Sequence, residues 1–96
     1  MPLQTKIAVE SYSPYVDPRR FQVQGFWKIT EHPLNWYVDE RFDYLVFSEG
    51  MFGRFYLEPY RYAEEVRRYE LFFNNLEPVQ IFVEGGYEVR VYRITR

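Results

Sequence analysis

The sequence predicts one small α/β domain, a Rossmann-like sandwich of two or three layers with the order β-α-β-α-β-β and a mainly parallel sheet. Residues 42–48 have strand length, with an uninterrupted apolar and aromatic run from Tyr44 to Phe47, which is typical of a strand buried on both faces in the middle of a parallel sheet. One helical pattern precedes this run and a longer one follows it. The chain closes with two strand-like segments around Gly85-Gly86, which indicates a hairpin that adds an antiparallel strand.

The first half of the chain supplies a strand and a helix before the central run. Lys6–Glu10 is short, largely apolar and followed by turn residues, so we expect the first strand there. Residues 19–30 alternate partly between polar and apolar side chains, which fits either a short extra strand or an ordered loop. Proline is favoured in a first helical turn, so Pro33 predicts a helix over residues 33–40. One face of this helix would carry Leu34, Tyr37, Val38 and Arg41.

The second half begins with Gly50 and Gly53, where we expect the backbone to turn sharply after the central strand. Apolar residues then recur at alternating intervals of four and three, which predicts a helix that ends at Asn74-Asn75. Residues 78–83 and 88–94 are the two strands of the predicted hairpin. The residues that set the helical period are Tyr62, Val66, Tyr69, Phe73 and Leu76.

The last strand has apolar side chains at both odd and even positions, which point to opposite faces of a sheet. Val89 and Val91 would face the core, whereas Tyr92 and Ile94 fall on the opposite face. Either a bulge shifts the register, or both faces of this strand are covered.

Composition limits the classes of function. The chain has 96 residues and a net charge of -2, with 12 basic residues scattered among 14 acidic ones, so it lacks the basic stripe that nucleic-acid binding requires. Cysteine is absent, which excludes disulfides, thiol redox chemistry and thiolate metal sites. We also find no apolar run near the roughly 20 residues that span a bilayer and no signal-peptide pattern at the start. We therefore expect a soluble chain with no nucleic-acid partner.

The residues that could support catalysis are few. His32 is the only histidine, and a surface or capping role is its ordinary explanation. Two carboxylates across a cleft could hydrolyse glycosides, but loop acids are usually solvated. Neither a dinucleotide fingerprint nor a phosphate loop occurs, so we expect no catalytic residue, no cofactor and no metal. The acids that follow predicted strands or the glycine turn are Glu10, Asp17, Glu49 and Glu58.

A binding crevice is the stronger prediction, because the loops after the first strand and the central strand would converge on one edge of the sheet. Aromatic faces, hydroxyls and one guanidinium there suit a sugar or a phosphate-bearing head group. The same residues could instead close a small core or form a docking surface for another chain. The predicted ligand-binding residues are Tyr12, Tyr15, Ser48, Gly50, Gly53 and Arg54.

Six segments also form a pattern through their order and spacing. They are Ile7-Ala8-Val9-Glu10-Ser11-Tyr12-Ser13-Pro14, His32-Pro33-Leu34-Asn35-Trp36-Tyr37, Phe42-Asp43-Tyr44-Leu45-Val46, Gly50-Met51-Phe52-Gly53-Arg54-Phe55, Pro59-Tyr60-Arg61-Tyr62 and Val89-Arg90-Val91-Tyr92-Arg93-Ile94. Together they resemble the soluble C-terminal region of prokaryotic polytopic membrane glycosyltransferases of the GT-C type, related to dolichyl-phosphate-mannose protein mannosyltransferases.

This resemblance implies that residues 1–96 are a single α/β domain at the C-terminal end of a longer membrane protein, on the extracytoplasmic side. Such an enzyme transfers sugar from a polyprenyl-phosphate donor, and its catalytic acid lies in the membrane part, so no catalytic residue carries over. The chain would then be a non-catalytic accessory domain that contributes to acceptor binding or assembly. Its partners would be the membrane-embedded part of the enzyme and a glycan, lipid-linked sugar or protein acceptor.

Two alternatives remain open. The chain could be a free-standing small-ligand or carbohydrate-binding module that uses the loops after the first strand and the central strand. It could also be a self-associating structural protein, which would show a mass that depends on concentration.

Overall fold

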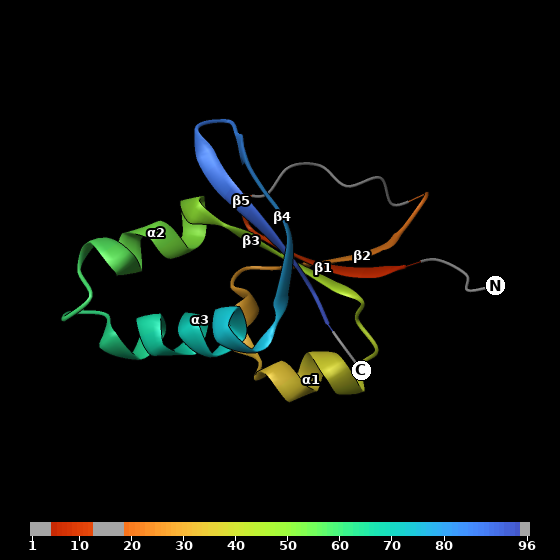
Figure 1. Cartoon of the computed structure of the whole chain (residues 1–96), viewed down its shortest axis with the longest axis horizontal. Helices are drawn as coiled ribbons and strands as arrows, with labels where there is room; N and C mark the ends of the chain where they lie inside the picture. Colours follow the sequence, from red (N-terminus) through yellow and green to blue (C-terminus); the bar gives the residue numbers. More distant parts are fainter. Residues whose placement is uncertain (1–4, 13–18, 95–96) are drawn as a thin grey trace.

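The computed structural model describes residues 5–12 and 19–94. The elements occur in the order β1 (Lys6–Glu10), β2 (Gln22–Phe26), the 3-10 helix η1 (Ile29–Glu31), α1 (Leu34–Asp39), β3 (Tyr44–Ser48), α2 (Glu49–Leu57), α3 (Ala63–Asn75), β4 (Glu77–Glu84) and β5 (Tyr87–Arg93). The chain is therefore a mixed α/β domain built on one five-stranded sheet, as Figure 1 shows.

The sheet is mixed, with the strand order β2-β1-β3-β5-β4. β1 pairs in parallel with β2 and β3, whereas β5 pairs antiparallel with β3 and β4. The prediction of a mainly parallel sheet was wrong, because the last strand inserts between β3 and β4 instead of extending the edge. The predicted order of elements was also wrong, because β2 and α2 are additional.

β2 decides between the two interpretations of residues 19–30. Its Gln22 and Gln24 are exposed, while Val23 and Phe26 are half-buried. A strand at the edge of a sheet can leave its polar side chains in water in this way. The alternation of polar and apolar residues therefore indicated a strand. This strand pairs along its whole length with β1.

β3 is the central strand and confirms the buried run. Leu45 and Phe47 are fully buried against the helices, and Val46 is buried on the opposite face. Its neighbours differ from the prediction, since β1 is parallel to it and β5 is antiparallel.

The three helices cover the same face of the sheet, which gives two layers (Figure 1). The main core lies between them and is dominated by aromatic rings that meet edge to face. A smaller cluster on the other face centres on Ile7, Val46 and Val89. The buried residues of the main core are Ala8, Ile29, Tyr37, Phe42, Leu45, Phe47, Met51, Phe52, Phe55, Tyr69, Phe72, Tyr92 and Ile94.

α2 replaces the sharp glycine turn that the sequence predicted. Ser48 caps this helix, because its Oγ accepts a hydrogen bond of 3.2 Å from the amide of Gly50. Glycine inside a helix costs about 1 kcal/mol relative to alanine. Burial of the apolar side chains on the inner face outweighs that cost. The buried residues of α2 are Met51, Phe52 and Phe55.

α1 and α3 confirm the two predicted helices. α1 lies within residues 33–40 and buries Tyr37, and α3 buries Tyr69 and ends at Asn75. The predicted period did not include Phe72, which is also buried. Among the helices of the described segments, none is both long and apolar enough to cross a bilayer.

The C-terminal hairpin confirms the predicted turn. Gly85 and Gly86 have φ angles of 62° and 86°, a left-handed backbone that glycine adopts without strain. Val89 and Tyr92 of β5 are buried on opposite faces of the sheet. The last strand is therefore covered on both faces, and the bulge in this ladder falls in β4, between Pro78 and Gln80.

Candidate functional site

The carboxyl ends of β1 and β3 bring three of the predicted ligand-binding residues together. Ser48 Oγ donates a hydrogen bond of 3.0 Å to the carbonyl of Tyr12 and accepts one of 3.2 Å from the amide of Gly50. The side chain of Ser48 is buried, and both contacts are made within the protein. Tyr15, which was also predicted at this edge, lies outside the described residues.

Tyr12 adopts a left-handed backbone conformation, with a φ angle of 68°. This conformation is unfavourable for a bulky side chain and occurs most often where the surrounding structure enforces it, commonly at functional sites. Gly50 allows the close approach, because a Cβ atom at that position would lie 2.7 Å from Cβ of Tyr12. The close packing of Tyr12 therefore explains why position 50, in the first turn of α2, is glycine.

Tyr12 is the middle of three exposed aromatic side chains, which we call the aromatic row. Its ring centroid lies 6.4 Å from that of Trp27 and 6.2 Å from that of Tyr87. Trp27, Tyr12 and Tyr87 are 58%, 55% and 44% exposed. They come from the segment after β2, the segment after β1 and the start of β5. Their side chains therefore form a surface that leaves large apolar faces in contact with water.

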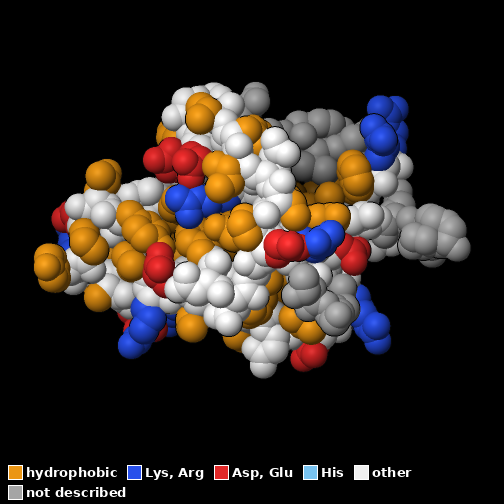
Figure 2. Space-filling view, viewed as in Figure 1, with side chains coloured by type: hydrophobic (Ala, Val, Ile, Leu, Met, Phe, Trp, Pro, Cys, Tyr) orange, Lys and Arg blue, Asp and Glu red, His pale blue; other side chains and the backbone are white. Residues whose placement is uncertain are grey.

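A pocket of about 570 Å³ adjoins the aromatic row between α2 and the hairpin. We call it the α2 pocket. It joins the row at Tyr87, which lines it, and at Gly50, over which Tyr12 lies. Figure 2 shows apolar side chains gathered over the α2 end of the molecule. The lining residues include the predicted Gly50, Gly53 and Arg54 together with Phe52, Tyr87 and Arg90.

The two arginines of the α2 pocket differ in how they are held. Arg90 forms an ion pair of 2.6 Å with Glu88 and lies over the rings of Phe52 and Phe73, at 5.0 and 4.9 Å. Arg54 is exposed, donates to the carbonyl and the sulfur of Met51, lies 5.5 Å from the ring centroid of Phe55 and forms no ion pair with any described residue. The charge of Arg54 is therefore available to an anionic group.

Gly53 has a packing reason of its own. A Cβ atom there would lie 3.0 Å from Cγ of Glu49, whose side chain crosses Gly53 to accept a hydrogen bond of 2.8 Å from the amide of Glu88. This bond ties the first turn of α2 to the hairpin. Glu49, which accepts this bond, lines one wall of the α2 pocket.

Glu10 is buried at the end of β1, and no local pattern in the sequence indicated this burial. Its Oε1 accepts a hydrogen bond of 3.1 Å from the amide of Ser48, and its Oε2 accepts bonds of 3.0 Å from the amide of Ile29 and 2.6 Å from the phenol of Tyr69. We call these four residues the Glu10 cluster. Burial raises the pKa of the Glu10 carboxyl from 4.5 to about 7, although these hydrogen bonds and the charge of Lys28 lower it in part.

The surroundings of the Glu10 cluster are polar on the α3 side. Burial raises the pKa of the Tyr69 phenol, the charge of Glu10 raises it further, and the nearby hydroxyl of Thr30 lowers it. Thr30 Oγ1 is buried without a hydrogen bond of normal geometry to any described residue. Lys28, which is half-buried, forms an ion pair of 2.8 Å with Glu65.

The acids proposed for paired-carboxylate chemistry do not behave as a pair. Glu10 is engaged by three donors, Glu49 binds the hairpin, and Glu58 is exposed beside Arg61 at 3.7 Å. Asp17 lies outside the described residues. The site therefore combines exposed aromatic faces with the positive charge of Arg54, and these groups suit ligand binding.

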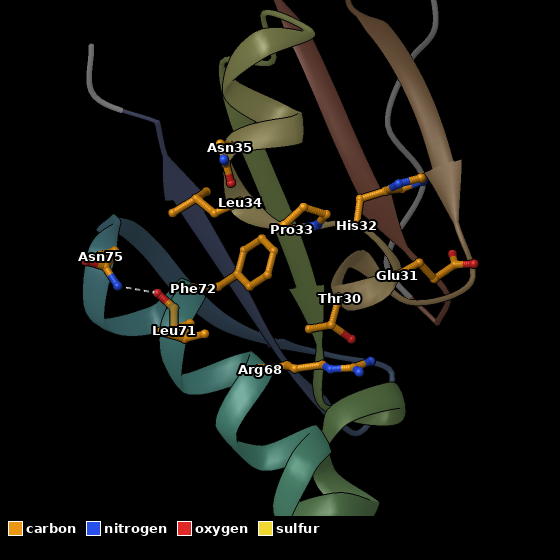
Figure 3. A pocket seen from close by; sticks show the side chains of 10 residues that line it. All are labelled: Thr30, Glu31, His32, Pro33, Leu34, Asn35, Arg68, Leu71, Phe72 and Asn75. Atoms are coloured by element: carbon orange, nitrogen blue, oxygen red, sulfur yellow. Dashed lines mark hydrogen bonds between the residues drawn. The ribbon is translucent and has the colours of Figure 1, made fainter.

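A second pocket, of about 460 Å³, lies between η1, α1 and α3 (Figure 3). We call it the α1–α3 pocket. Leu34, Leu71 and Phe72 provide apolar walls, while Arg68 at its rim is paired with Glu64 at 3.3 Å. His32 also lines this pocket, half-buried and stacked on Trp36 with ring centroids 3.9 Å apart. The prediction of a surface or capping histidine was therefore incomplete, since its ring is part of the aromatic packing.

Residues 5–12 and 19–94 contain no group of three His, Asp or Glu side chains placed to hold a metal ion. Comparison of the chain with protein-family models, with curated proteins and with solved structures gave no significant match. The likeness to membrane glycosyltransferases therefore remains an expectation from the sequence segments.

Proposed function

We propose that this chain is a non-catalytic, sugar-binding accessory domain of a polyprenyl-phosphate-sugar-dependent membrane glycosyltransferase. Its binding surface would be the aromatic row together with the α2 pocket. The observation that carries the proposal is the row of three exposed rings, centred on Tyr12 and continuous with a pocket that contains Arg54.

The aromatic row suits a sugar because the C–H faces of a pyranose ring are apolar and pack on the electron-rich faces of aromatic side chains. Tyrosine and tryptophan also offer a polar group at the ring edge to sugar hydroxyls. The strained backbone of Tyr12 supports a binding role, because Ser48 bonds its carbonyl and Gly50 makes room for its Cβ while the ring stays exposed.

Arg54 extends the proposal to phosphorylated sugars. A guanidinium recognises phosphate through parallel hydrogen bonds, and that of Arg54 lies at the α2 pocket without a carboxylate partner among the described residues. A sugar phosphate could therefore place its ring on Tyr87 and its phosphate near Arg54. The head group of a lipid-linked sugar has this combination of a ring and an adjacent phosphate.

The test is a titration of the isotopically labelled chain, followed by amide chemical shifts. The probes are methyl α-D-mannopyranoside, mannose 1-phosphate and inorganic phosphate. We expect both sugars to shift the amides of Tyr12, Trp27 and Tyr87, and mannose 1-phosphate to shift those around Arg54 as well. Shifts confined to the α1–α3 pocket, or no shifts with any probe, would contradict the proposal.

The substitution Arg54→Gln tests the contact with the phosphate separately from the contact with the sugar ring. We expect this substitution to weaken mannose 1-phosphate binding at least threefold and to leave methyl α-D-mannopyranoside binding unchanged. Arg61→Gln is the matched control, since Arg61 is an exposed arginine that does not line the α2 pocket. An equal loss in both variants would indicate a general charge effect instead of a phosphate site.

The free-standing carbohydrate-binding module is the second candidate, because it would use the same aromatic row. The two candidates differ in whether the domain works beside a membrane-embedded partner at the extracytoplasmic face. The reading frame upstream of the Met1 codon discriminates between them. Successive apolar segments of about 20 residues there would favour the accessory domain, and a start codon without them would favour the independent module.

A further inference from the structure

The edge of the sheet at β4 has features that the sugar-binding surface does not explain. β4 is the last strand in the order and pairs with β5. Its other edge has no strand partner among the elements of residues 5–12 and 19–94. Such an edge presents unpaired amide and carbonyl groups, which form a template for another strand.

The exposed side chains of β4 add an apolar stripe to this free edge. Ile81 and Val83 are 55% and 71% exposed. Ile81 is opposite Arg90, whose guanidinium lies over core rings, so the stripe lies on the side of the sheet that carries the helices. Phe82 points to the other side, where it packs half-buried against the cluster around Val89.

The middle of β4 lacks the charged side chains that usually protect an edge strand. Residues 78–83 contain no charged side chain, and four of these six residues are Val, Ile or Phe. Natural edge strands commonly carry a lysine or another charge that prevents pairing. Pro78 and the bulge between Pro78 and Gln80 interrupt the first part of β4, so the regular free edge runs from Gln80 to the end of the strand.

We propose that β4 is a self-association edge, at which two copies of this chain pair antiparallel around a two-fold axis at Phe82. In this register Phe82 lies opposite Phe82 of the second copy, and Ile81 lies opposite Val83 of the second copy. The apolar stripes then join on one face and the phenylalanines on the other, so the strand is complementary to itself. Gln80 to Val83 carry no charge, and this register places Glu84 opposite Gln80 of the second copy, so no like charges lie opposite each other.

The contact is small, because it involves one strand edge and two exposed side chains per copy. Stable interfaces bury at least about 1,200 Å² in total, so we expect a weak and reversible dimer with a Kd between about 1 μM and about 1 mM. Sedimentation equilibrium of the chain from about 10 μM to about 1 mM covers this range. The expected result is a mass that rises from monomer to dimer.

Ile81→Lys and Val83→Lys test the edge directly. Both positions are exposed, so we expect each variant to keep its circular dichroism spectrum and to weaken dimerisation at least tenfold. Leu57→Lys is the matched control, because Leu57 is 84% exposed at the end of α2 and lies outside the proposed contact. An equal effect of the control would overturn the assignment to β4.

Hydrogen exchange gives a second readout. We expect the amides of residues 80–84 that point away from β5 to become more protected as the concentration of the unmodified chain rises. A single monomer mass at every concentration overturns the proposal and leaves the edge open to a strand from a different protein. Growth beyond a dimer overturns the closed two-fold arrangement.

Discussion

The phenol of Tyr69 donates a hydrogen bond of 2.6 Å to Oε2 of Glu10, which lies 59 positions earlier in the chain. This bond joins α3 to the end of β1. Glu10 also accepts from Ser48, whose hydroxyl holds the backbone of Tyr12. The buried carboxyl and the proposed sugar-binding surface are thus connected through one residue.

We expect the stability of the domain to depend on the ionisation of Glu10. Its pKa rises from 4.5 to about 7 on folding, so the folded state binds a proton more tightly than the unfolded state. The resulting stabilisation is complete below pH 4.5 and is lost as the pH rises through about 7. A shift of this size corresponds to about 3 kcal/mol in the free energy of unfolding.

Urea unfolding of the chain and of Glu10→Gln between about pH 4 and about pH 8 measures this dependence. The difference in unfolding free energy between the two proteins isolates the titration of residue 10. We expect the unmodified chain to lose stability relative to Glu10→Gln as the pH rises. A difference that stays constant over this range would show that Glu10 does not titrate there. Glu58→Gln, at an exposed position, serves as the control.

Tyr69→Phe removes one donor from the Glu10 carboxylate and keeps the ring. We expect a loss of about 1–3 kcal/mol in the free energy of unfolding, because a buried charged acceptor loses a hydrogen bond. The pKa of Glu10 should rise further, since the bond from Tyr69 lowers it in the intact protein. Carbon NMR of the Glu10 carboxyl measures this pKa. An unchanged pKa in Tyr69→Phe would contradict the role given to the phenol.

Gly50→Ala and Gly53→Ala form a matched pair within α2. At Gly50 a Cβ atom would meet Cβ of Tyr12 at 2.7 Å, whereas at Gly53 it would meet the flexible side chain of Glu49 at 3.0 Å. We expect Gly50→Ala to destabilise the domain by about 1–3 kcal/mol through overpacking. Gly53→Ala should destabilise it less, because the Glu49 side chain can shift to admit the new methyl group and alanine favours the helix. Thermal unfolding of the two variants checks the order, and the reverse order would refute the packing explanation.

Tyr12→Gly and Tyr12→Ala separate the backbone strain from the ring. Both remove the aromatic side chain, but only glycine adopts a φ angle near 68° without cost. We therefore expect the glycine variant to be more stable than the alanine variant by about 1–2 kcal/mol. Chemical denaturation compares them, and greater stability of the alanine variant would show that Tyr12 is not held in a left-handed conformation.

The sequence predicted those elements whose apolar residues either form a continuous run or recur with one helical period. The run through Leu45 and Phe47 predicted the buried strand, and the spacing of Val66 and Tyr69 predicted α3. α2 could not be predicted in the same way, because Gly50 and Gly53 favour a turn locally. Their presence in a helix is explained by contacts with Tyr12 and Glu49, which only the folded chain supplies.

The position of the last strand could not be predicted either, since strand order depends on pairing between distant segments. Local patterns gave the hairpin but not its insertion beside β3. At the site, Tyr12 contacts Gly50, and Gly50 and Arg54 line the same pocket, as chain position predicted, while their role in binding stays a prediction. Residue type and chain position missed Trp27, which follows β2, and Tyr87, which begins β5, because the places of β2 and β5 in the sheet follow from the tertiary fold.

The most direct test of the account compares sugar binding in Tyr12→Ala, Tyr87→Ala and the control Tyr60→Ala. Tyr60 is a tyrosine that is 98% exposed and forms no part of the aromatic row. Amide-shift titration with methyl α-D-mannopyranoside gives the affinity of each folded variant. We expect the two row variants to bind at least fivefold more weakly and the control to bind like the unmodified chain. Equal affinity in all four proteins would contradict sugar binding at the aromatic row.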